Sequence, residues 1–309
     1  MISIQQMHYL IVLSEERHFQ RASERCFVTQ PTLSMQVKKA EDVLGYAIFD
    51  RGTNPIELTA FGKQLIVICR DVLQEFDKID IARQKMDGNY REYIRIGIIP
   101  TISSYMIPNL FPIWKEAMHD VQIEIQEMKT TQLLEALENK TIDLGILAGP
   151  IAHNQWRTIP LFLEEIKAYI PQFDSDKLTN DYLKNFHPWL LSKGNCLRTQ
   201  MMEFCEISND MEPNQWSYQG GNIDMLVKMV DLNGGYTLVP SNHVLPIEKR
   251  KKLYSIHTKS DNQSPARQVI ALLPKRSIKF DSIGRLIRQI QHQYPTVVDS
   301  NKFQLLGWE

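Results

Sequence analysis

One segment, residues 26–45, carries a complete set of signals for the start and the end of a helix. Its sequence is CFVTQPTLSMQVKKAEDVLG. Thr29 is a residue type that caps helix N-termini, Pro31 falls in the first turn where its missing N–H costs nothing, and Gly45 can end a helix in the left-handed conformation. The apolar residues between these signals recur at helical spacing: Leu33, Val37, Ala40 and Leu44. We therefore expect an amphipathic helix over residues 30–44.

The segments on either side of this helix predict a small DNA-binding fold. Ser3 and Gln6 have the spacing of a capping box, so a first helix should follow Ser3, and a short second helix should cover 19–26. Residues 47–51 and 56–58 alternate like strands around the turn sequence GTNP, as in a β-hairpin. Three helices followed by a hairpin describe a winged helix–turn–helix.

The outward face of the 30–44 helix is the candidate DNA-reading surface. Short polar side chains near its start suit base edges, and cations suit phosphates. The predicted DNA-contacting residues are Thr29, Gln30, Pro31, Thr32, Ser34 and Lys38 on the helix and Arg51 on the hairpin. A solvated polar face with no partner is the alternative, because the net charge of −1 does not by itself indicate a nucleic-acid partner.

A long helix is predicted from Thr59 to about Met86. Apolar residues recur along it every three or four positions: Leu58, Phe61, Leu65, Ile68, Val72, Phe76 and Ile79. A single helix cannot bury such a seam by itself. We expect it to pair two protomers, since a palindromic DNA site needs a dimer, although packing against the following domain is an alternative.

The remainder of the chain is typical of a globular α/β protein. A length of 309 residues with 43% hydrophobic residues predicts about two domains. No apolar run approaches the roughly 18 residues of a membrane helix, so we expect a cytoplasmic protein without membrane contact. Buried strands are predicted within 93–101, 141–149 and 266–274.

Two of the four cysteines, Cys196 and Cys205, stand nine positions apart in GNCLRTQMMEFCE, a segment with helical apolar spacing. Four cysteines in so long a chain do not make a disulfide scaffold. The pair can be buried thiols that only pack, metal ligands or a redox-active couple; no zinc-type spacing accompanies it, which disfavours metal. Cys26 and Cys69 lie on predicted core faces and are expected to pack.

The chain resembles the LysR-type transcriptional regulators in two stretches, FQRASERCFVTQPTLSMQVKKAEDVLGYAIFDR and ELTAFG. The resemblance implies an effector domain of two α/β subdomains, similar to periplasmic solute-binding proteins, after the winged domain and its linker helix. It also implies a homodimer or homotetramer that binds double-stranded promoter DNA, with RNA polymerase as a further partner, no cofactor and no enzymatic activity. The expected boundaries are 1–60 for the winged domain, 59–88 for the dimerisation helix and 89–309 for the effector domain, with subdomain I at about 90–163 and 268–309 and subdomain II at about 164–267.

Within that family, the segment GNCLRTQMMEFC is most similar to the members that sense hydrogen peroxide, and RIGIIPT, QLLEAL and YTLVP support the likeness. The resemblance implies that Cys196 reacts with peroxide and that Cys205 then forms a disulfide with it. The residues implied to line the peroxide pocket are Thr101, Thr130, Asn195 and Arg267. Asn195 departs from the family pattern, where a histidine precedes the reactive cysteine, which puts the peroxide sensitivity in question.

Helix geometry adds a constraint on this chemistry. Cys196 is expected in the first turn of a helix and near Arg198, and both features favour the thiolate. Nine helical residues rise about 13 Å, well beyond the Cα separation that a disulfide tolerates, so the bond requires the helix to unwind. Oxidation would thereby change subdomain packing and the spacing of the DNA-binding heads. A regulator that senses a metabolite between the subdomains is the alternative; an enzyme is disfavoured, because no G-x-S-x-G, G-x-G-x-x-G or Walker motif is present.

Overall fold

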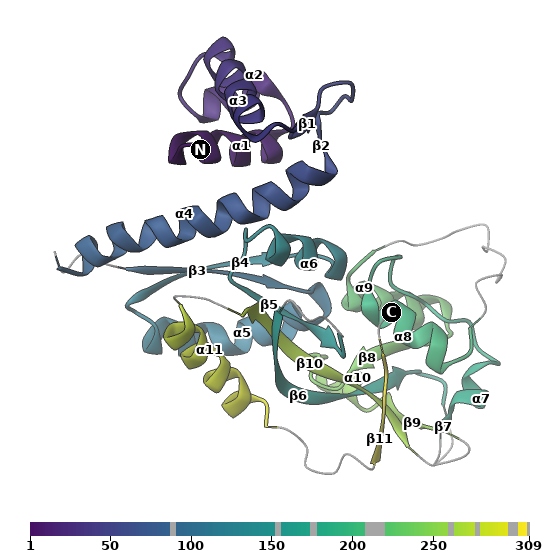
Figure 1. Cartoon of the computed structure of the whole chain (residues 1–309). Helices are drawn as coiled ribbons and strands as arrows, with labels where there is room; N and C mark the ends of the chain where they lie inside the picture. The colour runs from purple at the N-terminus through teal and green to yellow at the C-terminus, as the bar shows by residue number, and fades with distance from the viewer. Residues whose placement is uncertain are drawn as a thin grey trace. The chain divides into compact units, whose positions relative to one another are not determined.

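The chain forms two compact units, which are described separately (Figure 1). The structure is a computed structural model that describes residues 1–86, 91–151, 156–173, 178–207, 220–258, 263–275, 279–295 and 302–307. The first unit consists mainly of residues 1–90 and the second of nearly all the rest. Within the described ranges, every helix is too short or too polar to cross a lipid bilayer.

The amino-terminal unit contains the predicted helices and hairpin. Its elements are α1 (Ile4–Glu16), α2 (Phe19–Arg25), α3 (Gln30–Leu44), β1 (Phe49–Asp50), β2 (Glu57–Leu58) and α4 (Ala60–Met86). The Ser3 and Gln6 side chains form the capping box, Thr29 caps α3, and Gly45 ends it with φ of 75°. The hairpin is confirmed with shorter strands than expected. The helix boundaries were therefore predictable from local signals.

The start of α4 is fixed against the hairpin. The Thr59 hydroxyl accepts a hydrogen bond of 3.0 Å from the Gly62 N–H, which confirms Thr59 as the cap. A Cβ atom on Gly62 would lie 2.1 Å from the carbonyl oxygen of Ile48, so only glycine allows this close approach. Residues 87–90, where the helix was predicted to break, lie outside the described residues.

The apolar seam of α4 divides into two parts. Leu65 is 8% exposed and packs with Ile66 and Cys69 in the core of its own amino-terminal unit. The expectation that Leu65 belongs to a dimer interface is therefore wrong, because α1 covers that side of α4. Leu58 and Phe61 are half-buried against the same core. The other seam residues are exposed by 38–63%: Ile68, Val72, Phe76 and Ile79. They form a continuous apolar stripe at helical spacing, which we call the exposed stripe.

The second unit contains, among its described residues, a nine-stranded sheet with two hydrophobic cores. The first core lies around three parallel strands and three helices: β3 (Glu92–Ile98), β4 (Val121–Glu127), β5 (Leu144–Gly149), α5 (Pro100–Ala117), α6 (Thr130–Glu138) and α11 (Phe280–Gln293). The three predicted strands are confirmed as β3, β5 and β10 (Ser264–Pro274).

The long strand β6 (Trp156–Tyr169) runs from the first core into the second, and its first part pairs antiparallel with β10 (Figure 1). The other elements of the second half are β7 (Leu178–Thr179), α7 (Asn180–Leu183), α8 (Cys196–Phe204), α9 (Ile223–Asn233), β8 (Thr237–Pro240), α10 (Ile247–Arg250) and β9 (Leu253–His257). Because both cores share β6, side chains from this strand and from its partner β10 can lie near the boundary between them.

The carboxyl-terminal strand β11 (Phe303–Leu305) departs from the expected subdomain boundaries. It pairs in parallel with residues 264–266 of β10, and Leu306 packs in the second core. The expectation had placed the whole of 268–309 in the first subdomain. The sequence gives no local signal for this pairing, because the strand has only three residues and its partner lies about forty positions away.

Candidate redox site and DNA-binding surface

The thiol of Cys196 lies where two helices begin. Cys196 is the first residue of α8, as predicted, and Thr130 is the first residue of α6. The Thr130 side chain and the backbone N–H groups of Cys196 and Leu197 hydrogen-bond the sulfur. Gly194 precedes the helix with φ of 87°, a conformation that favours glycine. The local structure thus places the buried Cys196 sulfur beside several hydrogen-bond donors.

Arg267 supplies the cation of this site. Its side chain is fully buried, and its Nη1 donates to the Thr101 hydroxyl at 3.0 Å while Nη2 donates to the Thr101 carbonyl at 3.1 Å. Both Nε and Nη2 lie 2.8 Å from Oε2 of Glu164. Three of the predicted pocket residues, Thr101, Thr130 and Arg267, therefore interact with Cys196 or with one another.

The pKa of the Cys196 thiol is raised above its ordinary value. Burial is the main cause, and the Arg267 charge and the Thr130 hydrogen bond offset it only in part. The expectation of a thiol shifted toward the thiolate is therefore wrong for this structure, in which Cys196 is a free thiol. The expected role of Arg198 is also wrong, because its guanidinium donates to the carbonyl oxygen of Leu191 at 3.0 Å.

Asn195 is the residue before the helix and is 7% exposed. Its side-chain amide donates to the carbonyl oxygen and to the hydroxyl of Ser192, both at 3.0 Å, and makes no capping bond to α8. Asn195 therefore holds the loop that leads into the helix.

Two residues of the site escaped the sequence analysis. Glu164 on β6 stands directly opposite Arg267 on β10, and both are fully buried. Tyr105 on α5 lies beside them, and burial together with the Glu164 charge raises its pKa. Oε1 of Glu164 and the Tyr105 hydroxyl have no hydrogen-bond partner among the described residues. A single glutamate within a predicted strand does not indicate, from the sequence, that it pairs with an arginine on a distant strand.

Cys205 occupies a different environment at the other end of α8. It is the C-cap residue, and its thiol is buried in the second core, whereas Cys196 packs in the first. Burial raises the pKa of Cys205 to about 11, although a hydrogen bond with Tyr236 lowers it in part. All four cysteines are free. The nine residues of α8 separate the two thiols by about 13 Å of helical rise.

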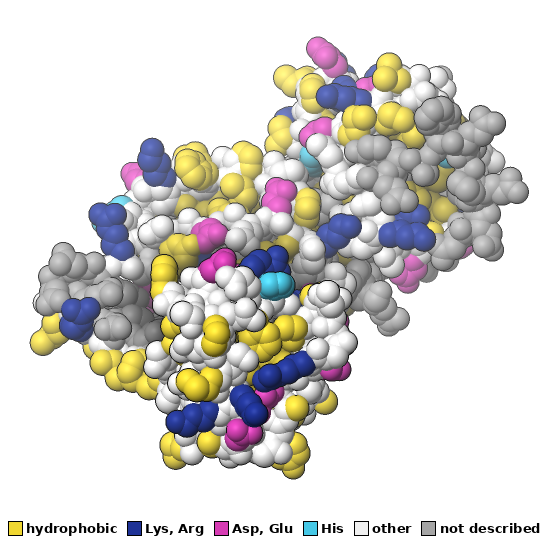
Figure 2. Space-filling model, turned by 90° about the horizontal axis from the view of Figure 1, so that it is seen from above, with side chains coloured by type: hydrophobic (Ala, Val, Ile, Leu, Met, Phe, Trp, Pro, Cys, Tyr) yellow, Lys and Arg dark blue, Asp and Glu magenta, His cyan; other side chains and the backbone are white. Residues whose placement is uncertain are grey.

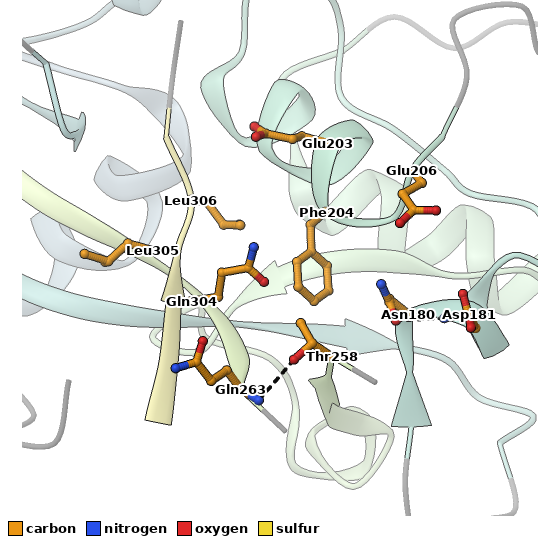
Figure 3. A pocket seen from close by; sticks show the side chains of 10 residues that line it. All are labelled: Asn180, Asp181, Glu203, Phe204, Glu206, Thr258, Gln263, Gln304, Leu305 and Leu306. Atoms are coloured by element: carbon orange, nitrogen blue, oxygen red, sulfur yellow. Dashed lines mark hydrogen bonds between the residues drawn. The ribbon is translucent and has the colours of Figure 1, made fainter. Parts of the chain in front are cut away.

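The far end of α8 also borders a pocket of about 560 Å³ (Figure 3). The lining residues are Asn180, Asp181, Glu203, Phe204, Glu206, Thr258, Gln263, Gln304, Leu305 and Leu306. The Phe204 ring extends from α8 toward Thr258 in this view. Gln200, a buried residue of α8, donates to the carbonyl oxygen of Leu306 at 3.3 Å, which links the helix to the strand β11. The carboxyl-terminal end of α8 thus adjoins open space.

The predicted DNA-contacting residues lie on or beside the amino-terminal half of α3. Gln30, Pro31 and Lys38 are exposed, as is the cap Thr29, while Thr32 and Ser34 are half-buried. Arg51 on the hairpin is bound to Glu41 at 2.9 Å and lies over the Phe19 ring, with its side chain 45% exposed. In Figure 2, Lys and Arg side chains are interspersed with other types on the face in view. Any DNA specificity must therefore come from particular side chains.

Among the described residues, no group of three or more His, Cys, Asp or Glu side chains is arranged to bind a metal ion. The combination of a winged helix–turn–helix, a long helix and a two-core α/β unit with a buried thiol instead defines a class of bacterial regulator. Residues 4–63 match the bacterial regulatory helix–turn–helix protein, lysR family, and residues 87–295 match the LysR substrate binding domain. The chain belongs to the LysR family of transcriptional regulators.

Individual relatives within the family are similar over four fifths of this chain or more. The chain is 29% identical over 305 residues to a hydrogen peroxide-inducible genes activator of Haemophilus influenzae, covering 97% of this chain and all of the relative. It is 30% identical to the DNA-binding transcriptional dual regulator OxyR of Escherichia coli K12, covering 81% and 82%. The fold is similar to a full-length OxyR variant from Pseudomonas aeruginosa, with a TM-score of 0.72, 26% identity and coverage of 94% and 98%.

Proposed function

We propose that this protein is a transcriptional regulator that senses hydrogen peroxide through Cys196 and Cys205. The observation that carries the proposal is the Cys196 sulfur, buried among hydroxyl and N–H donors and an arginine, on the same helix as a second thiol. The name of the Haemophilus influenzae relative, a hydrogen peroxide-inducible genes activator, supports the same function.

The first step is attack of the Cys196 thiolate on one oxygen of hydrogen peroxide. An S–O bond forms, the O–O bond breaks, and the sulfur is oxidised to a sulfenic acid while the leaving hydroxide takes up a proton and becomes water. Thr130 and Arg267 can stabilise the thiolate and the departing hydroxide, because they donate hydrogen bonds or positive charge at the sulfur. Thr101 holds the Arg267 guanidinium in place.

The second step joins Cys196 to Cys205. The Cys205 sulfur attacks the sulfenic sulfur, a disulfide forms, and the hydroxyl leaves as water with the thiol proton. Since α8 holds the thiols in two different cores, the helix must unwind for them to meet. The pocket beside Phe204 provides space next to the end of the helix that has to move.

The output is a change in DNA-binding geometry. We propose that α3 reads promoter DNA through Thr29, Gln30, Pro31, Thr32 and Ser34, while Lys38 and Arg51 contact phosphates. The exposed stripe of α4 pairs two protomers, and two dimers form the tetramer. Oxidation in the effector unit would then alter the spacing of the DNA-binding heads, and thereby the engagement of RNA polymerase. Promoter DNA as the partner places the protein in the cytoplasm.

Peptide mapping by mass spectrometry before and after dilute peroxide tests the proposal. We expect a disulfide between Cys196 and Cys205 in the native sequence. Cys196→Ser should not respond, and Cys205→Ser should accumulate sulfenic acid at Cys196 without a disulfide. Cys26→Ser and Cys69→Ser are the matched controls and should respond normally. If no peroxide dose produced the disulfide in soluble protein, recognition of a metabolite by the effector unit would replace this function.

A further inference from the structure

Glu164 is a buried charge that the proposed chemistry does not use. It lies on β6 directly opposite Arg267, and both side chains have no exposed surface. Only one carboxylate oxygen, Oε2, accepts from the guanidinium. The other oxygen, Oε1, accepts no hydrogen bond from the described residues. The carboxylate therefore neutralises Arg267 by direct contact with its guanidinium.

We infer that Glu164 is a positioning residue that holds Arg267 and limits how strongly its charge activates the Cys196 thiol. The inference rests on the proposed function of Cys196. An arginine with a carboxylate against it exerts a weaker field on a neighbouring sulfur than an arginine without one, and burial makes the difference larger than in water. Glu164 thus acts together with burial to keep Cys196 protonated at rest, which protects the sensor from trace peroxide.

The charges around Cys196 support this reading. Burial opposes the charge on Arg267, but the interactions with Glu164, Tyr105 and Cys196, in that order, outweigh it, and the Arg267 pKa is raised. An arginine keeps its proton in proteins, so removal of Glu164 leaves the positive charge in place. Other titratable groups of the surrounding elements are Tyr105, which lies beside Glu164, and Tyr294, which accepts from Asn109. Arg198 donates to the Leu191 carbonyl, Lys129 donates to the Lys193 carbonyl, and Glu127 and His243 contact the Ser103 and Ser104 hydroxyls of α5.

The variant Glu164→Gln removes this charge with little other change. The amide oxygen of glutamine can take the place of Oε2, and the amide nitrogen can take the place of Oε1 beside the Tyr105 hydroxyl, which can accept from it. The matched control is Glu165→Gln. Glu165 is the next residue of the same strand, its side chain points to the opposite face, and it pairs with Lys167 at 3.6 Å.

The test measures the rate of Cys196 oxidation by hydrogen peroxide against pH, in full-length protein with Cys205→Ser so that only the first step is observed. Glu164→Gln should lower the midpoint of the pH profile by about one unit. The thiolate fraction below the midpoint would rise about tenfold, and because a less basic thiolate is a weaker nucleophile, the net rate should rise roughly threefold. Glu165→Gln should leave the midpoint unchanged.

An unchanged or higher midpoint in folded Glu164→Gln would overturn the inference. If that variant did not fold, Glu164→Asp carries the test, because the shorter carboxylate moves away from Arg267 and should lower the midpoint by a smaller amount; an unchanged midpoint there overturns the inference as well. A native Cys196 that failed to react with peroxide at any pH would refute the proposed function itself, which is a distinct outcome.

Discussion

Truncation of Met201 should make the disulfide between Cys196 and Cys205 easier to form. Met201 lies in the middle of α8, and its side chain is fully buried in the second core. If α8 unwinds on oxidation, this side chain leaves its packing site, so its contacts stabilise only the reduced state. Truncation of a buried methionine to alanine costs about 2–5 kcal/mol. Met201→Ala should therefore destabilise the reduced state selectively.

The expected size of the effect follows from the two-electron couple. Since 30 mV corresponds to about 1.4 kcal/mol, a loss of about 2–5 kcal/mol lowers the reduction potential by roughly 40–110 mV. The assay is equilibration in defined thiol–disulfide buffers, with the oxidised fraction counted by alkylation and mass spectrometry. Leu226→Ala is the control, because Leu226 is equally buried in the same core but lies on α9.

Leu226→Ala should lower the free energy of unfolding while leaving the potential nearly unchanged. If Met201→Ala behaved in the same way, with lower stability and an unchanged potential, then α8 would keep its packing in the oxidised protein. The refolding mechanism would be refuted even though the disulfide chemistry survived.

Val72→Asp should dissociate the dimer in sedimentation of the full chain, because it places a charge in the exposed stripe, whereas Leu65→Asp should unfold the amino-terminal unit. Lys38→Ala should weaken DNA binding to all sequences and reduce the salt slope by about one, whereas Gln30→Ala should change the preferred sequence in a binding-site selection. Burial raises the pKa of Cys205 to about 11. The neutral thiol therefore stabilises the fold at neutral pH, and this contribution is lost as pH rises from the pKa of the thiol in the unfolded chain toward 11. In denaturant titrations of reduced protein, the free energy of unfolding of Cys205→Ala should fall by about 2–3 kcal/mol less at alkaline pH than that of the native protein. An equal fall in both proteins would contradict the burial of this thiol.

Local signals explain which features the sequence predicted. Caps and terminators lie within a few residues of the helix that they bound, so Ser3, Thr29 and Gly45 located α1 and α3 correctly. The first-turn position of Cys196 followed from the same kind of signal. The Leu65 assignment was wrong because helical spacing shows that a seam exists but does not tell which partner covers each part of it.

The site needed long-range information that spacing does not carry. Glu164 and Arg267 are 103 positions apart and meet only through the register of β6 against β10. The sequence suggested Arg198 as the activating cation because it is near in the chain, but its guanidinium binds Leu191. Likewise, the placement of Cys196 and Cys205 in separate cores depends on how α8 crosses between them.

The shared strand β6 has a consequence for how the effector unit melts. It contributes Leu161 and Phe162 to the first core and Ile166 and Tyr169 to the second, so neither core can lose its structure without disrupting the strand on which the other is built. Calorimetry of the effector unit should therefore give one cooperative transition, with equal calorimetric and van't Hoff enthalpies, although the unit has two halves. A substitution in either half would then lower the melting temperature of both, and the helix α8 can change shape against a scaffold that remains whole.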